Sequence, residues 1–258
     1  MAETAPLRTD YADVNGVKLY FETYGDANAS PLVLLHGGLM TIDLNFATLI
    51  PGLVERHLVI GVEAQGHGRT ANIDREITPA NSASDVVGLL DQLGIDRAHV
   101  LGHSMGAATA LELAVRHPDR VRSVVPISAS VRPDGMHSDF SSPERMAVSD
   151  RMPTQADFVA MTEAYQRLSP HPDQFTAFMQ SMSASAADLQ GWTDDELAGI
   201  TAPVLIVQGD HDFVTNEHAA LMADLIPGAK LAILPGTTHM TVTTKTTYLL
   251  PMLADFLD

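Results

Sequence analysis

Apolar positions in this sequence follow two alternating patterns. Short, continuous apolar runs, each typical of a strand buried on both faces, lie at 31–35, 57–62, 98–101, 121–127, 204–207 and 231–234. Between them, apolar residues at helical spacing predict helices at about 43–49, 81–93, 104–117, 217–225 and 246–257. Val17–Tyr24, which follows an Asn15-Gly16 turn, alternates like a half-exposed antiparallel strand. Strands that alternate with helices predict an α/β fold with a mostly parallel sheet covered on both faces.

Residues 132–199 depart from this alternation. They hold no apolar run of the buried-strand kind, and their spacing predicts short amphipathic helices at 142–149, 155–168, 172–182 and 194–198. The stretch also contains Trp192, the only tryptophan, and six of the twelve methionines. We therefore expect one α/β domain formed by residues 1–131 and 200–258, with 132–199 inserted into it as a helical cap.

Composition narrows the possible partners. The chain has 258 residues, enough for one large core, and its 15 basic and 32 acidic residues give a net charge of −17. That charge disfavours nucleic acid and anionic membrane surfaces as partners. The chain has no cysteine, so neither disulfides nor thiol chemistry are available to it. The N-terminus lacks the pattern of a secretion signal, and no apolar run is long enough to span a membrane. We expect a cytoplasmic protein.

Polar and glycine-rich loops follow five of the apolar runs. In open α/β sheets, ligands bind at the carboxyl ends of the strands, so these loops should meet at one edge. One of them contains Gly102-x-Ser104-x-Gly106, the spacing of a nucleophile elbow, in which a sharp strand-to-helix turn exposes a serine hydroxyl. The sequence therefore predicts a nucleophilic serine at residue 104.

Serine needs a base within hydrogen-bond reach, and that base needs a carboxylate to orient it. The loop 208–212 supplies Asp210 and Asp212, and the loop 235–239 supplies His239. The order serine, acid, histidine is that of the α/β-hydrolases. The sequence has no HExxH motif, and such a triad needs neither a metal nor a cofactor, so we expect none.

The chain resembles α/β-hydrolase-fold proteins over nearly its whole length. The motifs that carry this resemblance are HGG at 36–38, GHGRT at 66–70, GHSMG at 102–106, GDHD at 209–212, and the late His239. The resemblance implies an eight-stranded sheet with a helical lid. It assigns the triad acid to Asp212 rather than to Asp210, which would cap a turn, and the oxyanion-hole amides to Gly38 and Met105. Family members often carry an aspartate and an arginine in the loop before GHG, where this chain has Glu63-Ala64-Gln65, so the change should alter packing or pocket polarity rather than chemistry.

Other residues near these motifs have more ordinary expected roles. His36 and His67 should stabilise loops through hydrogen bonds, and His103 should pack beside the elbow. His211 could influence the base or simply be solvated. Residues that flank the catalytic loops are candidates for lining the substrate pocket: Leu39, Met40 and Met240. The methionine-rich cap favours an adaptable apolar site, and hence an uncharged, partly hydrophobic acyl or alcohol group.

The resemblance implies a lid-bearing serine hydrolase that cleaves a small to medium carboxylic ester or lactone. The serine at the elbow disfavours dehalogenase and epoxide-opening chemistry, in which relatives carry aspartate there. Hydrolysis of a C–C bond, aminopeptidase action and a perhydrolase side activity remain possible on the same triad. A small-molecule receptor that barely turns over is the alternative from another class. We expect a small-molecule partner and either a monomer or a homodimer.

Overall fold

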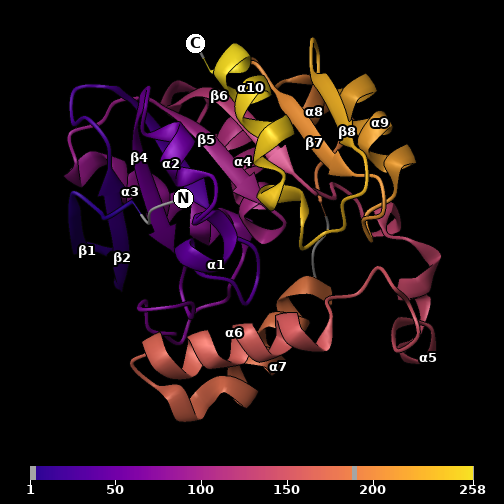
Figure 1. The fold of residues 1–258 in the computed structure, drawn as a ribbon. Helices are drawn as coiled ribbons and strands as arrows, with labels where there is room; N and C mark the ends of the chain where they lie inside the picture. Colours follow the sequence, from indigo (N-terminus) through magenta and orange to yellow (C-terminus); the bar gives the residue numbers. More distant parts are fainter. Residues whose placement is uncertain (1–3, 188–190, 258) are drawn as a thin grey trace.

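The computed structural model describes residues 4–187 and 191–257. Its central feature is one eight-stranded sheet with the strand order β1-β2-β4-β3-β5-β6-β7-β8 (Figure 1). The strands are β1 (Arg8–Val14), β2 (Val17–Tyr24), β3 (Ser30–Leu35), β4 (His57–Glu63), β5 (Ala98–His103), β6 (Val121–Ile127), β7 (Leu205–Gly209) and β8 (Lys230–Leu234). β2 pairs antiparallel with β1 and β4, and the other neighbours pair parallel. This confirms the expected mostly parallel α/β sheet.

Helices cover both faces of the sheet. Those that pack on it are α1 (Ile42–Phe46), α2 (Ile50–Leu53), α3 (Pro79–Gln92), α4 (Met105–Arg116), α8 (Asp194–Ala198), α9 (Asn216–Leu225) and α10 (Thr246–Phe256). Three further helices, α5 (Pro143–Met146), α6 (Gln155–Leu168) and α7 (Phe175–Ala187), lie between β6 and α8 along the chain. Side chains alternate along β3, so Val33 faces a core shared with α3, α4, α8 and α9, whereas Leu34 faces a core shared with α1, α2 and α10. The sheet is thus buried between two helical layers.

Three local expectations were wrong. Val17–Tyr24 is not half-exposed, because Glu22 accepts hydrogen bonds from the Tyr20 and Tyr24 hydroxyls and is buried with them. The single helix expected at about 43–49 is instead divided into α1 and α2, and Pro51 lies in the first turn of α2, where no N–H donor is needed. β1 was not anticipated at all, because this edge strand buries only Ala12 and Val14.

The chain changes direction across the sheet at β3. β4 lies on one side of it and β5 on the other, which makes the carboxyl ends of β3 and β5 the topological switch point where α/β proteins bind ligands. In Figure 1, α6 and α7 lie beyond these strand ends, away from the helices that cover the sheet. α8, in contrast, packs on the main body through Leu197, as does Trp192 before it. Within the described residues, no helix has the length and apolar character needed to cross a bilayer.

Candidate active site

Ser104 occupies the turn between β5 and α4. Its backbone has φ 53° and ψ −115°, a strained conformation for a residue with a side chain. The neighbouring glycines are required by close approach: a Cβ at Gly102 would lie 2.1 Å from the Gly106 oxygen, and one at Gly106 would lie 2.0 Å from the Leu35 oxygen. The Ser104 N–H donates to the Ile127 oxygen (2.9 Å), which anchors the turn to β6. This is the geometry of a nucleophile elbow.

Asp212 and His239 meet at the same edge of the sheet. His239 Nδ1 lies 2.8 Å from Asp212 Oδ1, and both side chains are almost fully buried. Ser128 Oγ donates to Asp212 Oδ2 (2.5 Å) and the Val214 N–H donates to Oδ1 (3.1 Å). Burial raises the pKa of Asp212, but His239 and these donors outweigh burial and hold the pKa below its usual value. A charged carboxylate therefore faces the histidine.

The His239 ring contacts two other rings. Phe213 stacks on it, with ring centroids 3.6 Å apart, and the His103 ring lies at 4.8 Å. The described side chains of Ser104 and His239 do not form a hydrogen bond with each other. In unliganded enzymes this link is often long and tightens when substrate binds. The structure thus brings the acid and the base into direct contact. Ser104 lies at the same edge of the sheet, where it lines a cavity together with Ser128 and Phe213, the residues that contact Asp212 and His239.

The two expected oxyanion donors lie on different elements and line one cavity with Ser104. Met105 is the first residue of α4, so its N–H has no acceptor within the helix and lies at the positive end of the helix dipole. Gly38 follows β3 and, like Ser104 and Met105, lines a shared cavity. Asn45 holds this region together: its Oδ1 accepts from the Gly37 N–H (2.8 Å) and lies 3.1 Å from His103 Nδ1.

The cavity beside Ser104 has a volume of about 470 Å³. Its apolar wall includes Met105, Met136, Met182 and Phe213, and its polar wall includes Ser128, Ser130 and Arg132.

The three residues proposed from sequence to contact substrate are not part of this lining. Leu39 packs against the Ile77, Tyr165 and Phe178 cluster, and Met40 is buried. Contact of substrate with Leu39, Met40 or Met240 stays a prediction.

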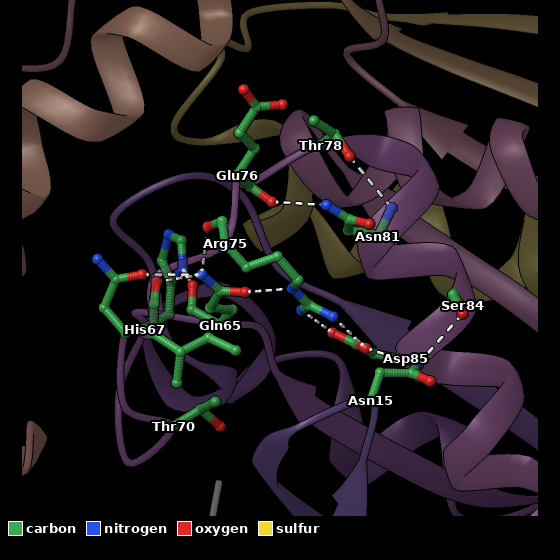
Figure 2. A network of polar contacts seen from close by, with 12 residues as sticks. Asn15, Gln65, His67, Thr70, Arg75, Glu76, Thr78, Asn81, Ser84 and Asp85 are labelled. Atoms are coloured by element: carbon green, nitrogen blue, oxygen red, sulfur yellow. Dashed lines mark hydrogen bonds and ion pairs between the residues drawn. The ribbon is translucent and has the colours of Figure 1, made fainter.

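The departure from the family pattern at residues 63 and 65 is accommodated by hydrogen bonds. The buried Glu63 carboxylate accepts from the Arg69 N–H (2.6 Å) and from Arg69 Nη1 (2.8 Å). Gln65 Nε2 donates to the Ile73 and Arg75 oxygens, at 3.2 and 2.8 Å, and its Oε1 accepts from Arg75 Nε (2.8 Å). Figure 2 shows the part of these contacts that involves Gln65 and Arg75.

Arg75 extends the network to helix α3. It forms an ion pair with Asp85, which also accepts from Asn15 in the β1–β2 turn (Figure 2). The network therefore fixes the loop that leads to Ile77, one of the residues lining the cavity.

Four further histidines lie near the site, and each has a partner in the structure. His36 Nε2 accepts from the Ala64 N–H (3.1 Å), and His67 Nδ1 lies 2.9 Å from the Gln65 oxygen, so their expected loop-stabilising role is confirmed. Burial lowers the pKa of His36 to about 4 and that of His67 to about 3. His103 Nε2 donates to the His239 oxygen (2.9 Å), and burial together with His239 lowers its pKa to about 3. His211 instead pairs with Asp150 (2.9 Å).

Asp210 has the turn-capping role expected of it. Its carboxylate accepts from the Gly236 and Thr237 N–H groups, at 2.9 and 3.0 Å, and these bonds hold its pKa below the usual value. It therefore shapes the loop that carries His239, while Asp212 is the acid in contact with the ring.

Three functional positions were missed from sequence: Ser128, Asn45 and Phe213. Ser128 has φ 55°, a rare value that no local motif announces, and its partner Asp212 is 84 residues away. Asn45 lies 58 residues from His103. Phe213 could have been suspected from its place directly after Asp212.

Comparison with known proteins agrees with this geometry. A family model for the alpha/beta hydrolase fold matches residues 30–162, which is more than half of the chain. The chain therefore belongs to the α/β-hydrolase fold family, and it is a hydrolase of that fold.

Three of the proteins that the chain is similar to have different names and activities. The 2-(acetamidomethylene)succinate hydrolase of Mesorhizobium japonicum is 25% identical over 254 residues, covering 90% of each chain. The enol-lactonase of Burkholderia xenovorans LB400 superposes with a TM-score of 0.75 and 26% identity, over 96% of this chain and 99% of that one. A dihydrolipoyllysine-residue acetyltransferase component of an acetoin cleaving system, from Cupriavidus necator, is 28% identical over 92% of this chain, which spans 66% of that protein.

Proposed function

We propose that the protein is a serine hydrolase that cleaves a small to medium, partly hydrophobic carboxylic ester or lactone through an acyl-enzyme intermediate. The observation that carries the proposal is the hydrogen bond between His239 and Asp212 at the strand edge where Ser104 lines a cavity of about 470 Å³. An enol-lactonase among the similar structures supports a lactone or ester as substrate.

In this mechanism Ser104 Oγ attacks the substrate carbonyl while His239 Nε2 takes its proton. Asp212 holds Nδ1–H, which leaves Nε2 as the acceptor and stabilises the imidazolium that forms. The Gly38 and Met105 N–H groups stabilise the tetrahedral oxyanion. His239 then returns the proton to the leaving alcohol, and a water molecule activated by the same ring hydrolyses the acyl-enzyme.

We further infer that residues 132–199 act as a lid. Met136 forms a β-bridge with Val214, two residues after Asp212. Arg151 Nη1 donates to the backbone carbonyl oxygen of Asp212 (2.7 Å). On the other side, a Cβ at Gly38 would lie 3.2 Å from the Met182 Cε. The segment thus touches both the acid loop and the expected oxyanion hole, which are the two places where a cover would exclude water.

The proposal is tested with p-nitrophenyl esters of increasing acyl length, together with small lactones. Ser104→Ala should lose about 10⁴-fold or more in kcat, since a triad acts as a unit. Ser84→Ala is the matched control, because Ser84 is exposed on α3 and its hydroxyl contacts Asn15. A fluorophosphonate label should map to Ser104 by mass spectrometry. Equal activity in Ser104→Ala, or covalent labelling without turnover of any ester, would overturn the hydrolase proposal.

A further inference from the structure

Beyond β6 the chain presents alternate residues to the cavity. Ser128, Ser130 and Arg132 line it, while Ala129 and Val131 between them are buried in the main core. Arg132 is the only Asp, Glu, Lys or Arg among the residues that line this cavity in the described chain. The wall that begins at Ser128, the partner of the proposed acid, therefore ends at a cationic residue, Arg132.

The backbone around Arg132 is fixed from both sides. The Val131 N–H donates to His218 Nε2 (3.0 Å), and Ser130 Oγ donates to the Arg132 oxygen (2.7 Å). Burial lowers the pKa of His218, so Nε2 is available as an acceptor at neutral pH. A cation on a backbone that is held in this way is positioned rather than loose, which is what a recognition group requires.

The partner of Arg132 in the structure is a replaceable one. Arg132 forms an ion pair with Asp194, whose side chain is 64% exposed and which is not part of the cavity lining. An ion pair with so exposed a carboxylate contributes little to stability. Arginine binds carboxylates through two parallel N–H···O bonds, and such bonds strengthen when water is excluded. A carboxylate inside the covered cavity would therefore compete well with Asp194.

We propose that Arg132 is the carboxylate-binding group of the substrate site, so that the hydrolysed ester or lactone carries a free carboxylate away from its scissile carbonyl. The proposal rests on the function proposed above and specifies its substrate class. It revises the uncharged substrate expected from the methionine-rich cap: Met136 and Met182 contact the apolar middle of the substrate, and Arg132 contacts its charged end. A chain of net charge −17 repels anions, so a cation at the cavity is needed to bind one.

The test uses two esters that differ only at the far end of the acyl chain. Mono-p-nitrophenyl glutarate has a terminal carboxylate where p-nitrophenyl valerate has a methyl group. Wild-type enzyme should prefer the glutarate ester, chiefly through KM, after uncatalysed hydrolysis is subtracted. Arg132→Met should lower kcat/KM for the glutarate ester at least tenfold more than for the valerate ester. Arg122→Met is the matched control, because Arg122 lies at the opposite end of β6 from the site, donates to the Arg97 oxygen and should leave both rates unchanged.

Asp194→Asn should change KM for the glutarate ester in the opposite direction to Arg132→Met. Removing the competing carboxylate should lower KM for the glutarate ester about threefold and leave the valerate ester as it was. A merely structural role of the Arg132–Asp194 pair would instead make both variants impair both esters equally. Equal losses on the two esters in Arg132→Met, or no loss on either, would overturn the proposal.

Failure of this inference can be told apart from failure of the proposed function. Calorimetry on Ser104→Ala with monomethyl glutarate and methyl valerate reports binding without turnover. Preferential binding of the anion that Arg132→Met abolishes, without hydrolysis of any ester by wild type, would keep the carboxylate site and reject the hydrolase. Ester turnover without any preference for the anion would keep the hydrolase and reject the carboxylate site.

Discussion

Phe213 stacks on the ring of His239, with centroids 3.6 Å apart and planes inclined by 26°. It also contacts Phe140, from the segment between β6 and β7, at a centroid distance of 4.8 Å. Phe213 directly follows Asp212 in sequence. Asp212 forms a hydrogen bond with His239, and Phe213 stacks on the face of its ring. The proposed lid therefore reaches the proposed base through a single aromatic ring.

Replacing this ring should impair catalysis more than folding. Phe213→Leu keeps an apolar side chain but removes the stack, which is the kind of contact worth about 0.5–1.5 kcal/mol. We expect kcat/KM to fall between about twofold and tenfold, since His239 loses a contact on one face. Phe140→Leu, which leaves the Phe213–His239 stack in place, should cost less. Steady-state kinetics on one ester, with thermal unfolding alongside, checks this; an equal loss in both variants would contradict a direct effect on the ring.

The two aspartates of the 209–212 loop should separate cleanly. Asp212→Asn exchanges a charged acceptor for an amide and should lower kcat by about 10⁴-fold, because the wrong histidine tautomer is then favoured. Asp210→Asn keeps an oxygen for the Gly236 and Thr237 N–H groups and should cost less than tenfold. Both variants are measured by kinetics and by circular dichroism. A larger loss of kcat in Asp210→Asn than in Asp212→Asn would show that Asp212 is not the triad acid.

Acid should destabilise the protein through its buried histidines. In the folded state the pKa is lowered from 6.5 to about 4 in His36 and to about 3 in His67 and His103, mainly by burial. A lowered folded-state pKa means that the unfolded chain takes up the protons first. The stabilisation is therefore complete above pH 6.5 and is lost as pH falls from 6.5 toward 3–4. Each histidine should cost about 1 kcal/mol between pH 6.5 and 5.5.

Denaturant unfolding at pH 7.5, 6.5 and 5.5 measures this loss. His67→Gln should reduce the slope of unfolding free energy against pH by one histidine's share, even if it lowers stability at every pH. His171→Gln, at an exposed position, should leave the slope as in wild type. A wild-type stability that stays flat from pH 7.5 to 5.5 would contradict the assignment.

The network in Figure 2 gives a prediction about stability. The Asp85 side chain is only 3% exposed and that of Arg75 is 20% exposed, so removing either partner leaves a charge poorly solvated. Asp85→Leu or Arg75→Met alone should therefore cost about 3 kcal/mol. The double variant should be less destabilised than the sum of the two, because no buried charge remains. Chemical denaturation of all four proteins completes the cycle, and additive losses would show that the two charges act independently.

The parts of this site that follow a buried strand could be predicted from sequence. Ser104, Asp212 and His239 each lie just after an apolar run, in a loop marked by glycine, and parallel strands bring such loops to one edge. Choosing Asp212 over Asp210 needed the family pattern, because local sequence offers two equivalent carboxylates. The structure agrees with that choice, since Asp212 contacts the ring and Asp210 caps a turn.

The residues that hold the site together could not be predicted, because their contacts are distant in sequence. Ser128 meets Asp212 across 84 positions, and Asn45 meets Thr243 across 198. The edge strand Arg8–Val14 was missed for a different reason: hydrophobic burial leaves a signal only at Ala12 and Val14, and pairing with β2 supplies the rest. From sequence, Gln65 indicates only a departure from the family pattern, because its hydrogen bond with Arg75 is visible in the structure alone.

The walls around Ser104 are unlike one another. Ser128, Ser130 and Arg132 form one side, and methionines and Phe213 form another. The third contains Gly38 and Met105, whose N–H groups are the proposed donors to the carbonyl oxygen. A substrate with a stereocentre near the scissile bond contacts three different surfaces, whose order around the stereocentre is fixed by the protein. Its two mirror images cannot satisfy all three, so hydrolysis of a racemic ester should be enantioselective.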